Sequence, residues 1–84
     1  MEEKQVGKVT HFFDRISVAV VELSDNLKVG ETIHFKSDKT DFTQIIGSMQ
    51  VEHQNIEEAK MGESIGLKTE QPVRVGDLVY KIVE

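Results

Sequence analysis

The sequence predicts an all-β fold, a six-stranded closed antiparallel β-barrel, and three observations lead to it. A pattern of basic, apolar, glycine, acidic, any and apolar residues occurs three times, at residues 28–33, 60–65 and 74–79. Its glycine supplies the positive φ that the third position of a tight turn often needs, and the residues after the exposed acid favour a strand. The segments between turns are short, and none keeps a 3.6-residue apolar period over three turns, as a helix would.

The predicted strands span residues 5–13, 16–23, 32–36, 41–52, 64–69 and 78–83. The first two form a hairpin, because only Asp14 and Arg15 separate them. In the first strand the two faces differ so weakly in polarity that its inward face stays undecided. The second strand has the highest β propensity in the chain, and the turn formers at 24–26 and the first glycine turn lead into the third.

The second half of the chain has one interruption inside a strand and one segment without a clear period. In residues 41–52 the apolar positions change parity at Gly47, which predicts a bulge that bends the strand, as barrel closure requires. Residues 53–60 are mostly polar and are compatible with one helical turn or an irregular loop. Pro72 has no amide hydrogen and therefore falls between the last two strands.

Composition limits the function classes. The chain of 84 residues has 15 acids and 10 scattered bases, which gives a net charge of −5. Because nonspecific nucleic-acid binding draws on phosphate neutralisation by Lys and Arg, a free-standing DNA-binding protein is disfavoured, whereas RNA contact within a larger assembly is not. The chain has no cysteine and no apolar stretch of transmembrane length. We therefore expect a single domain, 1–84, in the cytoplasm, without disulfides or thiolate zinc sites.

No set of residues predicts catalysis, a cofactor or a metal. The three histidines, His11, His34 and His53, are not spaced as metal ligands, and His34 is expected to be half-buried or on the surface. His11 beside Asp14 resembles a base with an orienting carboxylate, but no activated nucleophile accompanies the pair. A hairpin turn opened by Asp14 is the simpler interpretation. We therefore predict no enzymatic activity.

Aromatic residues are the candidate anchors for a partner. Phe12 and Phe13 are neighbours in a strand and so point to opposite faces. One of them belongs to the core, and the other is left for an interface or for stacking on a base. Phe42, which follows the polar loop at 37–41, has the same two interpretations.

Four segments, at residues 27–33, 47–53, 59–67 and 74–77, resemble in order and spacing the second domain of translational GTPases such as elongation factor Tu. The resemblance spans nearly the whole chain and implies a six-stranded barrel. It also implies a place beside the aminoacylated end of tRNA for Gln50 and His53, which stand where the family has an acid and an arginine. Neither residue reproduces that pair. The chain has no Gly-x-x-x-x-Gly-Lys-Ser/Thr loop, so no GTP hydrolysis is expected.

A closer resemblance is to the small barrel at the C-terminus of collagenase-like peptidase family proteins, some of which are linked to RNA modification. It is carried by residues 6–14, 18–21 and 40–44. Free-standing barrels described as translation elongation factor-like proteins are similar to the whole chain.

Two functional hypotheses follow. The first is a non-catalytic binding module that docks on RNA, tRNA or the ribosome, or on a translation- or RNA-modification-related protein. Its surface is the strand–loop region 50–60 with aromatic anchors, and the contact residues are Phe12, Phe13, Phe42, Gln50, Glu52 and His53. The alternative is an accessory barrel subunit of a collagenase-like peptidase or RNA-modifying enzyme, supplied in trans. The sequence leaves open whether an exposed sheet edge also pairs two copies of the chain.

Overall fold

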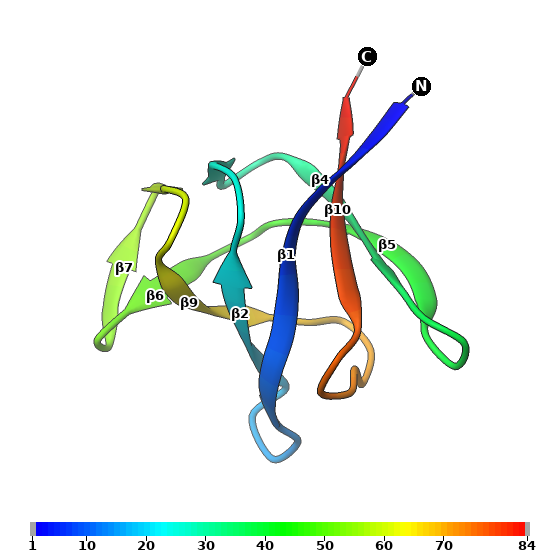
Figure 1. The fold of residues 1–84 in the computed structure, drawn as a ribbon. Coiled ribbons are helices and arrows are strands. Elements are labelled where there is room, and N and C mark those ends of the chain that lie inside the picture. Colours follow the sequence, from blue (N-terminus) through cyan, green and yellow to red (C-terminus); the bar gives the residue numbers. More distant parts are fainter. Residues whose placement is uncertain (1, 84) are drawn as a thin grey trace.

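The computed structural model describes residues 2–83, so residues 1 and 84 of the predicted domain lie outside the described part. This part consists of strands, turns and loops without a helix, which confirms the all-β prediction (Figure 1). It accordingly contains no helix with the length and hydropathy needed to cross a bilayer. The strands are β1 Glu2–Phe13, β2 Val18–Leu23, β3 Leu27–Lys28, β4 Thr32–Lys36, β5 Asp41–Ile45, β6 Met49–Val51, β7 Gln54–Ile56, β8 Glu58–Ala59, β9 Ser64–Lys68 and β10 Leu78–Val83.

Eight of these strands form one antiparallel sheet, and β3 and β8 form a separate two-stranded ladder. Neighbours in the large sheet follow the order β5-β4-β10-β1-β2-β9-β6-β7. The longest strand, β1, pairs with β10 along one edge and with β2 along the other. The predicted closed barrel of six strands is not confirmed, because the hydrogen-bonded ladder ends at β5 and β7 instead of returning on itself.

A side chain, and not a strand pair, connects β5 with the end of β9. The amide nitrogen of Gln44 donates to the carbonyl of Lys68 (2.9 Å), and its oxygen accepts from the backbone amide of Glu70 (2.8 Å). The two bonds go to residues two positions apart, a carbonyl that accepts and an amide that donates. A residue in a parallel ladder bonds to the backbone of its neighbouring strand in the same way. Gln44 is only 6% exposed, so both of its bonds are shielded from bulk water. Here the sheet is held together without a ladder.

The long strand predicted at 41–52 is divided into β5 and β6. Gln44 and Ile46 are buried on one parity, and Met49 is buried on the other, so the phase changes at Gly47 as predicted. The change is a break between two strands and not the predicted bulge within one. Residues 53–60 form neither a helical turn nor an irregular loop. They continue as β7, which pairs antiparallel with β6, and as β8, which pairs with β3.

The predicted β1–β2 hairpin is confirmed, with a longer turn than expected. Phe13 pairs with Val18, which leaves residues 14–17 as the turn in place of the two residues expected. Two register shifts interrupt β1, one between Gln5 and Gly7 against β10 and one between Val9 and His11 against β2. Each bulge displaces the alternation by one residue. The strand therefore shows no continuous period of two, and its inward face was not readable from the sequence.

The three glycine turns share one geometry. Their glycines have φ of 95°, 91° and 96°, at Gly30, Gly62 and Gly76. In each turn the acid's amide donates to the carbonyl of the basic residue, and the acid's carboxylate accepts from that residue's amide at 2.6–2.9 Å; the pairs are Lys28–Glu31, Lys60–Glu63 and Arg74–Asp77. The expectation that these acids are exposed was wrong, since Asp77 is 3% exposed. The carboxylate is part of the turn.

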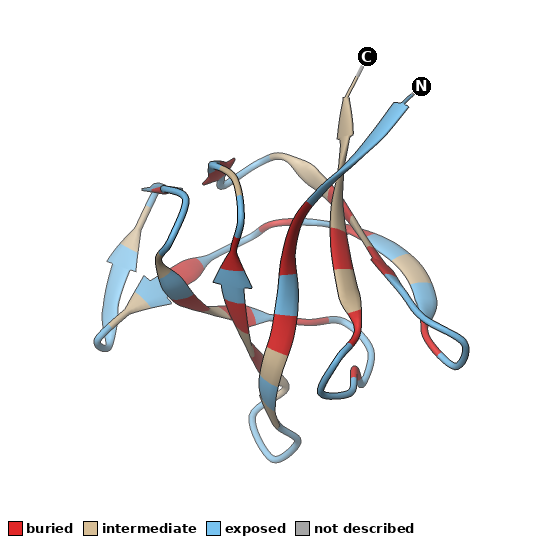
Figure 2. Ribbon diagram, in the orientation of Figure 1, coloured by how far each residue is buried: buried red, intermediate tan, exposed pale blue. Residues whose placement is uncertain are grey.

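The core is a single apolar cluster that the curved sheet encloses on its inner face. Figure 2 shows buried positions recurring along β1, β2, β4 and β9 with exposed or half-buried positions between them. This is the alternation expected of strands with one face on a core. The buried apolar residues are Val6, Val9, Ala19, Val21, Leu23, Leu27, Ile33, Phe35, Ile46, Met49, Ala59, Ile65, Leu67, Val73 and Val79.

Candidate docking surface

Two of the predicted aromatic anchors face the core. Phe12 and Phe42 are partly buried and pack against the central cluster. Phe42 also stacks on Phe35, with ring centroids 5.1 Å apart. Most of each ring therefore packs against the core, and only a small part of it is exposed to a partner.

Phe13 points outward and forms a ridge together with Ile16 of the β1–β2 turn. Their side chains are 47% and 61% exposed. The ring of His11 tilts against that of Phe13, with centroids 4.4 Å apart. We call Phe13 and Ile16 the Phe13 ridge. A ridge of two large apolar side chains leaves area exposed that burial against a partner would remove from water.

A groove lies beside this ridge on the outer face of β2, β9 and β6. It has a volume of about 220 Å³. Val18 and Val20 of β2 line it next to the ridge, and Gln50, Glu52 and His53 line its far side. Gly66 of β9 lies between the two sides, since it pairs with Val20 and with Gln50. We call this hollow the Gly66 groove.

The structure thus brings together four of the six residues that the sequence proposed as contacts: Phe13, Gln50, Glu52 and His53. Sequence reasoning missed Ile16, which was placed inside a strand, and it missed Gly66. A signal for Gly66 was present, because a lone glycine inside a strand marks a place where something approaches the backbone closely.

A second hollow of about 350 Å³ lies on the other side of the ridge. Asp14 and Arg15 line it together with Phe12, and it shares Phe13 and Ile16 with the Gly66 groove. The ridge is therefore bordered by depressions that carry charged side chains.

The turn at the rim of the Gly66 groove is strained. Glu52 and His53 connect β6 to β7, and both have positive φ, 51° and 66°. Two successive residues with positive φ make the type I′ hairpin turn, for which Asn-Gly is the usual sequence. A side chain other than Gly, Asn or Asp in this conformation costs on the order of 1 kcal/mol. The backbone conformation of the turn fixes the directions in which both side chains leave it.

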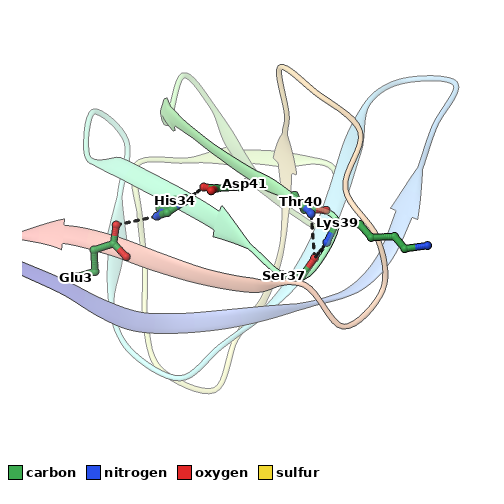
Figure 3. A network of polar contacts seen from close by, with 6 residues as sticks. All are labelled: Glu3, His34, Ser37, Lys39, Thr40 and Asp41. Carbon is green, nitrogen blue, oxygen red and sulfur yellow. Dashed lines mark hydrogen bonds and ion pairs between the residues drawn. The ribbon is translucent and has the colours of Figure 1, made fainter.

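The best-connected titratable group lies elsewhere. His34 of β4 is 13% exposed and contacts carboxylates at both ring nitrogens (Figure 3). Its Nδ1 lies 2.7 Å from Glu3, and its Nε2 contacts Asp41, which follows a loop fastened by the Ser37 hydroxyl and the Thr40 amide. These contacts raise the pKa of His34 above 6.5; the hydrogen bond to Asp41 contributes most, partial burial opposes it, and Glu3 adds to it.

The arrangement around His34 is suited to an ion pair. Both nitrogens are occupied, so neither is available to take a proton from a substrate. The carboxylates lie at opposite nitrogens and do not converge on one point. Within residues 2–83, no group of His, Cys, Asp and Glu side chains is arranged to hold a metal ion.

Comparison with known proteins relates this fold to a peptidase family. No protein-family model matches the chain. A protein of Methanocaldococcus jannaschii described as an uncharacterized protease is 40% identical over 81 residues, which cover 95% of this chain and 20% of that relative. The chain therefore spans about one fifth of the length of this relative.

Solved structures agree with that relation. The C-terminal domain of a U32 peptidase family protein from Geobacillus thermoleovorans superposes with a TM-score of 0.89 at 18% identity, covering 95% of this chain and 93% of that one. Its selenomethionine variant gives a TM-score of 0.86 at 18% identity, covering 90% and 96%. The fold is that of a U32 C-terminal domain.

These findings separate the two resemblances. They fit the C-terminal barrel of the collagenase-like peptidases, whereas the elongation factor Tu assignment is not confirmed. Translation and RNA binding gain no support from them. The relative is named a protease as a whole protein, and a catalytic role for the fifth that matches this chain is not shown.

Proposed function

We propose that this chain is a non-catalytic accessory subunit of a U32-family peptidase, supplied in trans to a catalytic partner that has no such domain. The observation that carries the proposal is the relation to one fifth of a longer protein described as a protease. A domain that is a small part of a larger protein has the rest of that protein as its natural neighbour. The same contact, made between separate chains, is the function proposed.

The chemistry of the domain supports a binding role. The chain has no cysteine, and the imidazole of His34 is engaged by carboxylates on both sides. The Gly66 groove contains an amide, a carboxylate and an imidazole beside apolar side chains, without a hydroxyl nucleophile among its lining residues. Such a surface provides contact area and hydrogen bonds. We place this binding role in the cytoplasm, in keeping with a chain that uses no cysteine.

Binding is tested with a purified full-length U32-family protein that naturally lacks this domain. Isothermal titration calorimetry with the 84-residue chain should give a one-to-one complex with a dissociation constant in the micromolar range or below, the range of a standard-size interface. An unrelated acidic protein of similar size is the control and should not bind. The proposal is abandoned if the U32-family protein gives no more heat than this control.

A second titration, with total tRNA at about 0.15 M salt, examines the translation hypothesis. At a net charge of −5 the domain has little to gain from phosphate contacts, so no shift is expected in a gel-retardation assay. Retention of tRNA at this salt, together with no U32 binding, would favour the RNA-binding hypothesis instead.

A further inference from the structure

We propose that the Phe13 ridge and the Gly66 groove form the surface by which this domain docks on its U32 partner. The inference depends on the proposed function and specifies its contact. The partner would present an apolar socket for Phe13 and Ile16, a side chain that rests on the backbone of Gly66, and a basic group facing Glu52.

The apolar part of the argument comes from how the exposed side chains are arranged. Phe13 and Ile16 adjoin each other between two hollows. Ile45, Met61 and Val75 are even more exposed, at 65–67%, but Ile45 ends β5 and the other two occupy the second position of two different glycine turns. An aromatic side chain between depressions is the geometry of an interface anchor, whereas scattered apolar residues on a surface are ordinary.

Neither the packing nor the backbone conformation of the domain requires a glycine at position 66, at the floor of the groove. A Cβ at Gly66 would lie 3.5 Å from Val18 Cγ1 and 3.7 Å from the Gln50 carbonyl, which is ordinary contact, and its φ is not positive. Gly7 differs, because a Cβ there would lie 2.7 Å from Val21. Since glycine weakens a strand interior, a glycine that the fold does not require points to a close approach from outside.

The charges on this surface identify the kind of partner. Asp14, Arg15 and Glu52 line the two hollows, which gives the surface a net negative charge when His53 is neutral. Within residues 2–83, Glu52 forms no ion pair, and the strained turn holds it at the rim. A carboxylate fixed in this way attracts a basic group of a protein and repels nucleic-acid phosphate. The surface is therefore suited to a protein partner with a basic rim.

A partner large enough to cover this surface is present in the Methanocaldococcus relative. The matched segment makes up 20% of that protein, so most of its chain lies outside the domain and is covalently attached to it. Of the surfaces described here, the ridge and its groove combine the anchor, the open floor and the charged rim.

The test measures the affinity of variants for the same full-length U32-family protein without this domain. Phe13→Ala should weaken binding about tenfold or more, as loss of a central aromatic anchor does. Glu52→Lys should weaken it about tenfold by placing like charges together. Met61→Ala is the matched control, since Met61 is at least as exposed and its turn lies at the opposite end of the molecule from the β1–β2 turn (Figure 1); its affinity should stay within about twofold.

Gly66→Ala separates binding from folding. Its methyl group fits the free domain, so the melting temperature should stay the same or rise, while binding should weaken several-fold because the methyl group occupies the floor of the groove. A variant that is more stable and binds less well cannot be explained by loss of fold.

The outcomes distinguish the two proposals. If the wild-type chain binds and both Phe13→Ala and Gly66→Ala bind equally well, the docking surface is wrong and the accessory function stands. If the wild-type chain does not bind, the function fails, and the assigned occupant fails with it. If light scattering shows a dimer that Phe13→Ala dissociates, the surface belongs to a second copy of the chain, and the proposal is overturned.

Discussion

His34 is the residue whose surroundings the sequence concealed most completely. Its partners Glu3 and Asp41 lie on β1 and at the start of β5, and they meet at β4 only in the folded sheet. A neutral imidazole has one N–H and can donate to one carboxylate, whereas the imidazolium donates to both. The protonated ring therefore connects the N-terminal part of β1 with the β4–β5 hairpin.

This connection makes stability depend on pH. The pKa of His34 is raised in the folded state, so its contribution is fully present below the unfolded value of 6.5 and is lost as pH rises through the higher folded pKa. We expect His34→Gln to be less stable than the wild type by roughly 0.2–1 kcal/mol at pH 5.5, the range for a partly exposed ion pair, and by less at pH 8.5. Urea unfolding of both proteins across this range measures the difference. A difference that is constant with pH would contradict the assignment.

At the scale of single elements, the sequence predicted the turns and strands that are determined by residues adjacent in the chain. The three glycine turns depend on one residue type at a fixed offset, and all three have the expected φ. The β1–β2 hairpin and the change of phase at Gly47 also follow from neighbouring residues. The inward face of β1 did not, because two bulges shift its alternation, and a bulge is fixed by the partner strand.

The β6–β7 hairpin was missed for a different reason. Its turn residues are Glu52 and His53, neither of which is typical of a type I′ turn, so from the sequence residues 53–60 are merely compatible with one helical turn or an irregular loop. The strands β3 and β8 have two residues each, too few to show any period. Because the β6–β7 hairpin was missed, the sequence could group Gln50, Glu52 and His53 on one surface but could not place them across a groove from Phe13.

The strained turn itself gives a prediction at this scale. Replacing Glu52 and His53 with Asn and Gly should stabilise the domain by about 1–2 kcal/mol, because both positions then accept positive φ with little steric cost. Thermal unfolding followed by far-UV circular dichroism measures the change. The substitution Asn55→Gly in the adjoining strand β7 is a control and should destabilise, since glycine weakens a strand. If the Asn-Gly variant is less stable than the wild type, neighbouring contacts of Glu52 and His53 outweigh the strain.

At the scale of the whole molecule, the central question is how an open ladder encloses a core. Strands β5 and β7 end the sheet, yet the apolar cluster is buried on all sides, and residues from both halves of the chain contribute to it. The connection through Gln44 explains part of this. Sequence analysis could place Gln44 in a strand, but the two backbone groups that it binds lie 24 and 26 positions further along the chain. No local pattern indicates such a contact.

Gln44→Leu removes this connection and leaves the Lys68 carbonyl and the Glu70 amide without their partner. We expect a loss of about 1–3 kcal/mol in the free energy of unfolding, the penalty for unsatisfied buried backbone groups. Thr43→Ala, on the exposed face of the same strand, is the matched control and should change stability by about 0.5 kcal/mol or less. Amide hydrogen exchange supplies a local measurement, because the Glu70 amide should lose protection in Gln44→Leu before the amides of β1 and β2 do. If the Glu70 amide stays protected and stability is unchanged, packing alone holds β5 against the end of β9, and the amide of Gln44 is not what joins them.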